Sequence, residues 1–267
     1  NAGDMKQGVV TSSEQLLQGK IAGLTVVQGS GDPTKGAVMR LRGGSSLSGN
    51  NAPLVVVDGV ANVDMNTVQA SDIISVDVLK DASASAIYGS RGANGVIIVT
   101  TNRKDTDVSS AEYSGYVGIA NASKKLDLLT AKNWSEHSEN NLGANTDWQD
   151  EIQQTAITQS HALTFGSSSK KGGYKGNLSY LNSEGVIKTS QLERLGASVS
   201  GFTKVWDDRL TLEAGLHTTS DNYTDFDNKK VFQSAYRLNP TLPVRNIDGS
   251  YAQDPEADSR YSNPLEY

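Results

Sequence analysis

The stretch Ser75–Thr101, SVDVLKDASASAIYGSRGANGVIIVTT, decides the fold of the N-terminal part of the chain. The run SVDVL is β-prone, and Asp81 is a suitable N-cap for the alanine-rich segment Ala82–Tyr88, which predicts a short helix. Three glycines then end the helix. The continuous β-branched run Val96–Val99 predicts a strand that is covered on both faces. The stretch therefore predicts strand, helix, glycine corner and strand in close succession.

The residues that precede this stretch predict further short elements. Ser12 or Ser13 can cap a helix over Glu14–Ala22, whose leucines and isoleucine fall on one face. Short β-prone runs separated by glycine-, serine- and asparagine-rich loops follow at Thr25–Gln28, Val38–Leu41 and Leu54–Val57. We expect these runs to join Ser75–Leu79 and Val96–Thr100 in one small mixed sheet, which gives an α+β or α/β domain. The polar segment Asn102–Ser110 reads as a linker and places a domain boundary near residue 105.

After the linker, apolar and polar residues alternate strictly along several segments. This is the pattern of a strand with one face toward lipid and the other toward a wet lumen, although a soluble β-sandwich alternates as well. The predicted strands lie around Tyr113–Ile119, His161–Ser167, Tyr174–Tyr180, Leu192–Phe202 and Leu210–Leu216. The residue pattern alone leaves both architectures open.

The connections between these strands differ in length. Lys170–Gly173 and Trp206–Arg209 read as tight turns, whereas Asn222–Tyr267 reads as one long, polar, proline-bearing loop. Ala131–Leu142 predicts a short helix, in which Trp134 and His137 are neighbours that pack together.

Three segments, in order, resemble the plug domain of SusC-like TonB-dependent outer-membrane transporters. LLQGKIAGLTVVQGSGDP (Leu16–Pro33) resembles the opening of that plug, MRLRGGSSLSGNNAPLVVVDGV (Met39–Val60) its centre, and LKDASASAIYGSRGANGVIIVTT (Leu79–Thr101) its end. Two later segments, TDWQDEIQQTAITQSHALTFGSSS and RLNPTLPVRNIDGSY, look like early barrel segments of the same family. One departure is Gln69-Ala70-Ser71, where the family commonly has Asn-Pro.

The resemblance implies a fold class and a domain organisation. Residues 1–105 would form an α+β plug domain, and residues 106–267 would form antiparallel strands of a large transmembrane β-barrel with extracellular loops. The barrel would be incomplete within this sequence. A periplasmic extension with a TonB box would precede the plug, and most of the barrel would follow.

The resemblance also implies a location, a function and partners. The protein would sit in the bacterial outer membrane and actively import a nutrient of the oligosaccharide or peptide class, with the plug gating the barrel. Its partners would be TonB with its inner-membrane energising complex, a SusD-like surface lipoprotein, outer-membrane lipid and a polar nutrient ligand. The alternative is a secreted or surface carbohydrate-binding or adhesin module without transport.

By similarity, the candidate ligand-binding site is the plug apex. Arginine, serine, asparagine and aspartate side chains there can hydrogen-bond a polar ligand. The residues are Arg40, Arg42, Ser45, Ser46, Ser48, Asn50, Asn51, Asn62 and Asp64. The competing interpretation is that an arginine is buried and ties the plug to the barrel.

Composition and motifs argue against other classes of protein. The net charge of −6 argues against nucleic acid, and the absence of cysteine removes disulfides and thiolate metal sites. The loop GSRGANG follows a helix and opens a strand, which is the reverse of a phosphate-binding loop. With no G-x-S-x-G motif and three separated histidines, we expect no catalytic residues, no cofactor and no metal. A calcium site among Asp221, Asp225 and Asp227 is the weaker alternative to a solvated loop.

Overall fold

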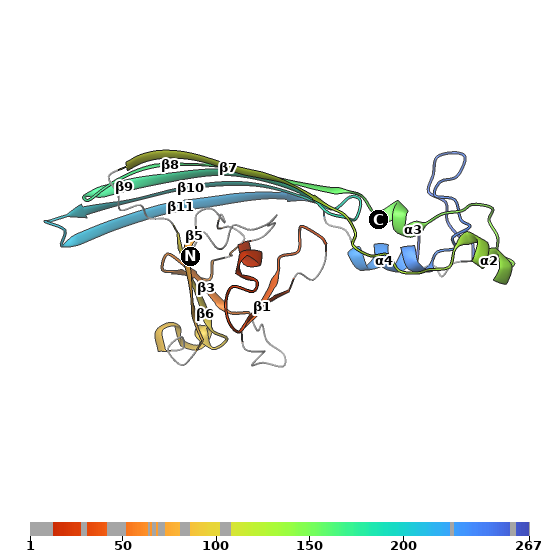
Figure 1. Cartoon of the computed structure of the whole chain (residues 1–267), viewed down its shortest axis with the longest axis horizontal. Coiled ribbons are helices and arrows are strands. Elements are labelled where there is room, and N and C mark those ends of the chain that lie inside the picture. The colour runs from red at the N-terminus through yellow and green to blue at the C-terminus, as the bar shows by residue number, and fades with distance from the viewer. Residues whose placement is uncertain are drawn as a thin grey trace. The chain divides into compact units, whose positions relative to one another are not determined.

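The computed structural model describes residues 13–27, 31–41, 52–63, 65, 68, 73–80, 86–101, 108–224, 227–256 and 260–266. These residues belong to two compact units (Figure 1). The first unit comprises Asn1–Gly118, Thr158–Ser183 and Leu192–Asn222, and the second comprises Ile119–Ile157, Glu184–Gln191 and Tyr223–Tyr267. The predicted boundary near residue 105 falls outside the described residues and stays a prediction.

The N-terminal domain, meaning the described residues from 13 to 101, contains a mixed sheet with the strand order β4-β3-β6-β5. Its strands are β3 (Leu54–Val57), β4 (Val60–Ala61), β5 (Ile73–Leu79) and β6 (Val96–Thr101). β3 and β6 are parallel, and the other two pairs are antiparallel. Val96, Ile97 and Val99 are fully buried in the central strand β6, which confirms the strand predicted there to be covered on both faces.

The prediction of one sheet for all the N-terminal strands is wrong. β1 (Leu24–Val27) and β2 (Val38–Leu41) pair only with each other, as an antiparallel hairpin. The physical reason is that the apolar face of these two strands packs against the core of the mixed sheet. Leu24, Val26, Met39 and Leu41 are buried in the same core as Val55 and Ile97 of the mixed sheet. The hairpin therefore packs through side chains onto that core, and it does not extend an edge of the sheet.

The two helices predicted in this domain are shorter than expected or only partly described. In place of a helix over Glu14–Ala22, a 3₁₀ helix, η2, spans Ser13–Leu17. The chain then turns at Gly19, whose φ of +70° is incompatible with a right-handed helix. Residues 86–88 are helical and lead into a second 3₁₀ turn, η5 (Gly89–Gly92), whereas the predicted helix start at Asp81–Ser85 lies outside the described residues.

Five long strands form a second sheet, which we call the long sheet. They are β7 (Val108–Ala120), β8 (Ala156–Ser169), β9 (Gly172–Glu184), β10 (Gln191–Val205) and β11 (Leu210–Tyr223). Each strand lies beside its neighbour in sequence, and the sheet is gently curved (Figure 1). All five strands were predicted from the alternating pattern, although each extends beyond the predicted segment.

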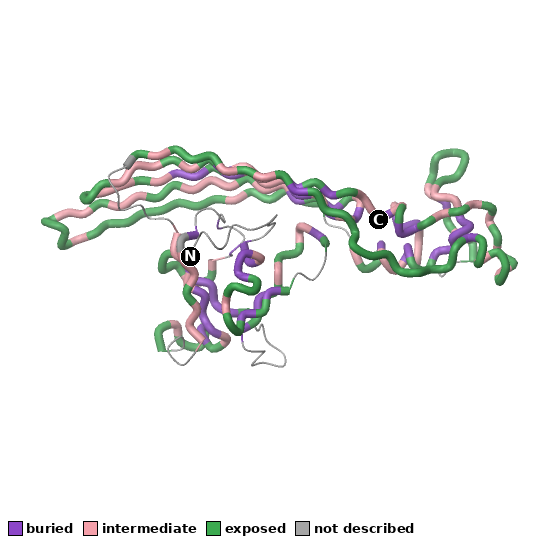
Figure 2. The backbone as a smooth tube through the Cα atoms, viewed as in Figure 1, coloured by how far each residue is buried: buried purple, intermediate pink, exposed green. Residues whose placement is uncertain are grey.

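The two faces of the long sheet differ in chemistry. Large apolar side chains recur at every second residue along the strands, and together they form what we call the outer face. They are exposed: Val117 is 66%, Ile119 71% and Leu216 67% exposed. On the opposite, inner face, Thr164 pairs with Asn177 through a side-chain hydrogen bond of 2.8 Å. Figure 2 shows most of these strands as exposed or half-buried, with the purple buried stretches of the sheet mainly toward the right-hand end of the strands. An apolar exposed surface of this extent marks an interaction surface.

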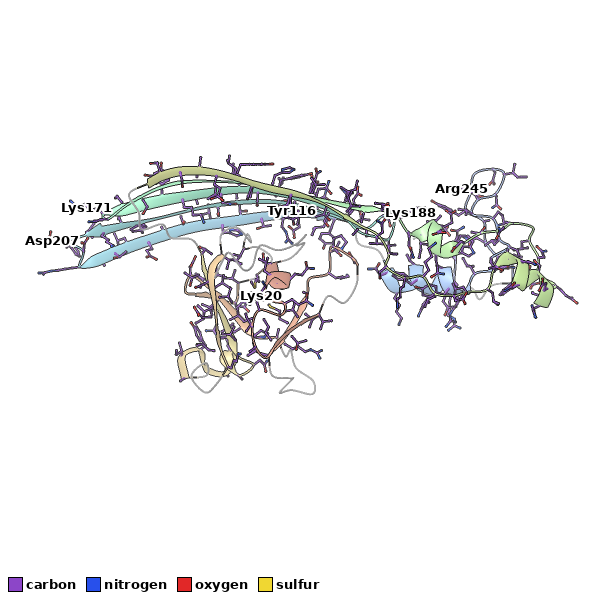
Figure 3. The ribbon with its side chains drawn as sticks, viewed as in Figure 1. Lys20, Tyr116, Lys171, Lys188, Asp207 and Arg245 are labelled. Carbon is purple, nitrogen blue, oxygen red and sulfur yellow. The ribbon has the colours of Figure 1, made fainter. Side chains whose placement is uncertain are left out.

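Two connections of the long sheet are tight turns. β8 leads to β9 through Lys171, and β10 leads to β11 through Asp207; both residues lie at the same end of the long sheet (Figure 3). The predicted turns at Lys170–Gly173 and Trp206–Arg209 are thereby confirmed. The connections that follow β7 and β11 are far longer and contain most of the second unit.

The second unit is a folded structure with its own core. It contains α2 (Ala131–His137), α3 (Trp148–Ile152) and α4 (Asn228–Arg237), which begin after the capping side chains of Thr130, Asp147 and Asp227. Trp148 and Ile152 of α3 pack with Ile187 and with Val231 of α4. The prediction of one long polar loop over Asn222–Tyr267 is therefore wrong, because that segment contains α4 and supplies much of this core.

Among the described residues, no helix is both long and apolar enough to span a membrane.

Gly95 offers a test of how the N-terminal domain is held together. Its φ is +89°, and a Cβ there would lie 2.9 Å from Leu41 Cδ2 and 3.2 Å from the Leu79 carbonyl oxygen. Gly19 has a φ of +70° with no atom within 4 Å of such a Cβ, so Gly19→Ala isolates the backbone penalty of about 1–2 kcal/mol. We expect Gly95→Ala to add an overpacking penalty of about 1–3 kcal/mol.

The measurement is the urea dependence of proteolytic cleavage within the N-terminal domain of the full-length protein. Equal urea midpoints for the two variants would contradict the packing of Gly95 between β2 and β5.

Candidate functional site

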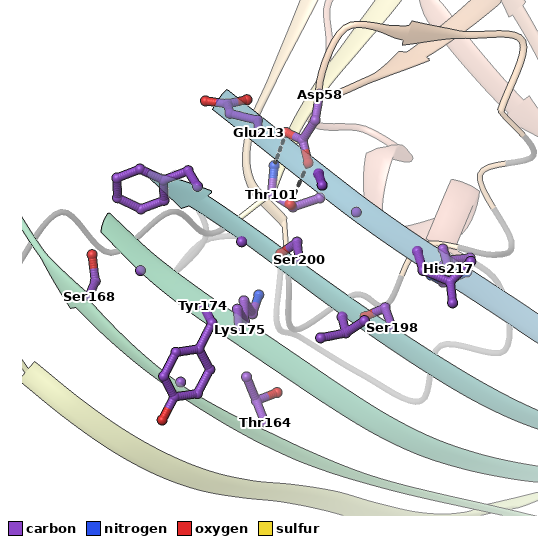
Figure 4. A pocket seen from close by; sticks show the side chains of 18 of the residues that line it. Asp58, Thr101, Thr164, Ser168, Tyr174, Lys175, Ser198, Ser200, Glu213 and His217 are labelled. Carbon is purple, nitrogen blue, oxygen red and sulfur yellow. Dashed lines mark hydrogen bonds between the residues drawn. The ribbon is translucent and has the colours of Figure 1, made fainter. Parts of the chain in front are cut away.

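A cavity of about 560 Å³ lies within the first unit, between the N-terminal domain and the inner face of the long sheet (Figure 4). From the N-terminal domain it is lined by Val57, Asp58, Val60, Val63, Val68 and Thr101. Residues of all five long strands line it from the other side. The cavity is therefore assembled from parts of the chain that are far apart in sequence.

The turn between β3 and β4 shapes the N-terminal side of the cavity. Asp58 and Gly59 follow β3 with φ values of +47° and +88°, which reverse the chain in two residues. The Asp58 carboxylate accepts hydrogen bonds from the Thr101 backbone N–H (3.0 Å) and hydroxyl (2.6 Å). Asp58 thus ties the end of β3 to the end of β6. Beside it, Val57, Val60 and Val63 give this side an apolar character.

Small or hydroxylated side chains dominate the opposite side of the cavity. The lining residues of β8 include Thr164, Gly166 and Ser168, and those of β10 include Ser198 and Ser200. Charged or ionisable side chains are sparser there and come from Glu112, Lys175, Glu213 and His217. Because side chains alternate across a strand, Val199 between the two serines points to the outer face, where it is exposed. The cavity therefore has one apolar side and one side rich in hydroxyl groups.

Only two of the predicted apex residues can be placed. Arg40 lies in β2 opposite Thr25 and is exposed. Asn62 is exposed, has a φ of +64° and donates its backbone N–H to the Val55 carbonyl at 2.8 Å. Neither residue lines the cavity. The other predicted residues, which lie outside the described part of the chain, are Arg42, Ser45, Ser46, Ser48, Asn50, Asn51 and Asp64. The apex site stays a prediction.

Sequence reasoning missed the residues that line the cavity. Serines at every second position of a strand signal a polar face, but they do not show which other part of the chain approaches it. The approach of the β3–β4 turn to the long sheet is a tertiary contact, and no local pattern in the sequence predicts it.

The described aspartates of the candidate calcium cluster have structural roles. Asp221 forms a two-point ion pair with Arg194 of the neighbouring strand, with both N–O distances 2.7 Å. Asp227 accepts from the Lys230 backbone N–H and caps α4, whereas Asp225 lies outside the described residues. Within the described ranges, no group of three or more acidic, histidine or cysteine side chains is arranged to hold a metal ion.

A row of polar aromatic side chains crosses the outer face of the long sheet. His161 lies between Tyr113 and Tyr180, with ring centroids 6.1 and 6.5 Å away, and its Nδ1 is 2.6 Å from the Tyr113 hydroxyl. The Tyr180 hydroxyl donates to Glu193 at 3.1 Å. Tyrosines with one apolar and one polar part are typical of the boundary between membrane and water.

In the second unit, a buried polar network joins distant segments. The carbonyl oxygen of Asn140 accepts from Trp134 Nε1 (3.1 Å) and from Asn239 Nδ2 (2.9 Å). The Asn239 side-chain oxygen accepts from the Thr241 backbone N–H (2.8 Å) and hydroxyl (2.7 Å), and the Asn239 carbonyl oxygen accepts from Trp148 Nε1 (3.0 Å). The helix predicted at Ala131–Leu142 is present as α2 but ends at His137, five residues earlier. Trp134 donates to the Asn140 carbonyl oxygen, and His137 Nδ1 lies 2.8 Å from the Asn133 carbonyl oxygen.

A charged contact holds another segment of the same unit. Lys125 Nζ bonds Asp150, and this hydrogen bond raises the pKa of Lys125 and lowers the pKa of Asp150 from their ordinary values. Both side chains are exposed, so the pair adds little to stability. The adjacent Gln149 holds the backbone at Leu126 more firmly. Its side-chain oxygen accepts from the Leu126 N–H and its Nε2 donates to the Leu126 carbonyl, both at 2.8 Å.

Comparison with known proteins identifies the family. Residues 1–96 match the model described as TonB-dependent Receptor Plug Domain. The TonB-dependent receptor SusC of Bacteroides thetaiotaomicron is 34% identical over 287 aligned positions, which cover 98% of this chain and 28% of that protein. The chain belongs to the SusC-like TonB-dependent receptors. Its N-terminal domain is the plug, its long sheet is barrel wall, and the protein is an outer-membrane protein.

Two further relatives agree with this assignment. The TonB-dependent receptor P3 of Formosa agariphila is 37% identical over 255 positions, covering 90% of this chain and 25% of that protein. The solved structure of the RagAB peptide transporter has the same fold, with a TM-score of 0.82 and 20% identity over 99% of this chain and 36% of that one. The chain thus spans about a quarter to a third of the length of these relatives.

In barrels of the outer membrane, short turns face the periplasm and long loops face the exterior. The turns at Lys171 and Asp207 are of the short kind. The expectation that residues 106–267 include extracellular loops stays a prediction.

Asn239→Ala tests whether the second unit depends on its buried network. The Asn239 side chain is 1% exposed, and its loss removes the bond to the Thr241 backbone N–H and one of the two donors to the Asn140 carbonyl, so we expect a destabilisation of about 1–3 kcal/mol. Asn145→Ala, at an exposed site of the same unit, is the matched control. The measurement is protease cleavage within the second unit of the full-length receptor. Equal protection of the two variants would contradict the role of Asn239.

Proposed function

We propose that the full-length receptor imports a polar nutrient of the oligosaccharide or peptide class across the outer membrane, with the plug closing the barrel. One observation carries the proposal. The long sheet has an apolar outer face and a hydroxyl-rich inner face, and the plug lines a cavity on that inner face. A sheet of this kind encloses a wet lumen, and a domain within the lumen blocks passive flow.

The comparisons support a transport role. SusC and P3 are named TonB-dependent receptors, and the solved relative is titled a peptide transporter. We propose that TonB, with its inner-membrane energising complex, supplies the work, and that a SusD-like surface lipoprotein is the partner at the exterior. The extracellular second unit, with its own core, is a preformed surface on which such a lipoprotein can dock. In this proposal the chain has no catalytic role.

The composition of the plug fits a domain that must move. Its main core consists of aliphatic side chains of leucine, isoleucine, valine and methionine, and its sequence is rich in glycine, serine and asparagine. A domain with a modest core and polar contacts to its surroundings rearranges at a lower free-energy cost than one with a large apolar interface. This property is what a gate requires, and a permanent stopper would not need it.

Uptake measurements test the transport function. Cells that express the full-length receptor are given labelled oligosaccharides and peptides, and surface binding and intracellular accumulation are measured separately. We expect accumulation to require TonB, whereas binding persists without it, because only transport needs the energised partner. Binding without accumulation in cells that contain TonB would favour the alternative, a surface binding module.

Removal of the plug tests its role as the closure. Deletion of residues 13–101 from the full-length receptor should make cells sensitive to large hydrophilic antibiotics, because an open wide barrel conducts them. The intact receptor at the same expression level is the control. A folded, plugless barrel that leaves antibiotic sensitivity unchanged would contradict this role.

A further inference from the structure

The inner face of the long sheet carries many small, hydroxyl-bearing or glycine positions beside the cavity, interspersed with the ionisable residues Glu112, Lys175, Glu213 and His217. The small positions are Ser110 and Ser114 of β7, Thr164, Gly166 and Ser168 of β8, Ser198 and Ser200 of β10, and Gly215 of β11. We propose that the imported solute leaves the barrel through this cavity, along β8, β10 and β11 and past the β3–β4 turn of the plug. This inference rests on the proposed transport function and adds the route.

The chemistry of this surface suits passage better than capture. Serine and threonine hydroxyls both donate and accept hydrogen bonds, so a polar solute can exchange partners along the strand as it moves. Passage requires several weak sites, because one strong site would retain the solute. Small side chains also leave room: the cavity holds about 560 Å³, which is within the range of small-molecule sites.

The position of the cavity along the strands places it toward the exit. Its lining residues in β8 and β9, Thr164–Ser168 and Gly173–Lys175, flank the short turn at Lys171. Those in β10 and β11, Ser198–Phe202 and Glu213–His217, run from the middle of these strands toward the short turn at Asp207. Short turns are periplasmic, so this space lies in the periplasmic half of the wall.

The plug presents its most weakly attached strand to the same cavity. β4 pairs with β3 at two register positions only, Val56 with Ala61 and Val57 with Val60, whereas β3 pairs with β6 at four. Val60 is 63% exposed and lines the cavity. Strands with few backbone hydrogen bonds open locally at low cost, so the passage can widen here while the β3–β6 core stays intact.

A simpler explanation is that small residues let the plug pack closely against the wall. Close packing would fill the space, as it does in protein interiors. The cavity at these same residues argues against that explanation.

Single-cysteine labelling tests the route, and this chain contributes no cysteine of its own. Ser200→Cys places a thiol on the inner face beside the cavity, and Leu195→Cys places one on the exposed outer face of the same strand, away from the cavity, as the matched control. The full-length receptor, with any cysteine outside this chain replaced, is modified in cells with a bulky, polar thiol reagent. We expect modification at position 200 to abolish TonB-dependent uptake and to leave surface binding of the nutrient unchanged. Modification at position 195 should change neither.

The outcomes separate this inference from the proposed function. Full uptake after complete modification of Ser200→Cys would overturn the route, as would a thiol there that never reacts in transporting cells. Ser198→Cys is the second probe if Ser200→Cys does not assemble. Absence of TonB-dependent uptake in the unmodified receptor would instead refute the transport function itself.

Discussion

The structure depends on the hydrogen-bonded pairing of long strands whose side chains alternate between two environments. In a bilayer, every backbone polar group needs a partner within the protein, and paired strands supply one. β8 and β9 pair in unbroken register from Thr158–Ser183 to Ser169–Gly172. That register sends Leu163 and Leu178 to the outer face together, and Thr164 and Asn177 to the inner face. A slip of one residue would reverse both faces.

The plug is built on a different principle. Its mixed sheet is small, and its central strand β6 is buried because β3 and β5 flank it while the β1–β2 hairpin packs onto the shared core. Asp58 and Thr101 then join the strand ends that face the cavity. The fold therefore concentrates its rigidity in β3, β5 and β6 and leaves β4 as a two-residue edge. This uneven distribution is the property that a movable gate needs.

The core of the second unit is assembled from three connections that follow strands of the long sheet. It takes Trp148 from the connection after β7, Ile187 from that after β9, and Val231 from that after β11. Each connection contributes apolar side chains to one shared core, so their folding is interdependent. Asn140 and Asn239 then satisfy the polar groups that this assembly buries.

Local patterns in the sequence determined much of this architecture. The strands at Val38–Leu41 and Leu54–Val57, the buried run at Val96–Val99, the five alternating strands and the two tight turns follow from side-chain periodicity and turn residues, which act over a few positions. The helix α4 was missed although Asp227 could cap it and Val231 and Ala235 lie one turn apart, because the surrounding segment is polar.

Only the tertiary structure decided the separate packing of the β1–β2 hairpin, the core of the second unit and the cavity beside Ser198 and Ser200. Each of these features joins residues that are distant in sequence. The free energy of such contacts depends on the closing of long loops and on shape complementarity. Neither can be predicted from the pattern of a few neighbouring residues.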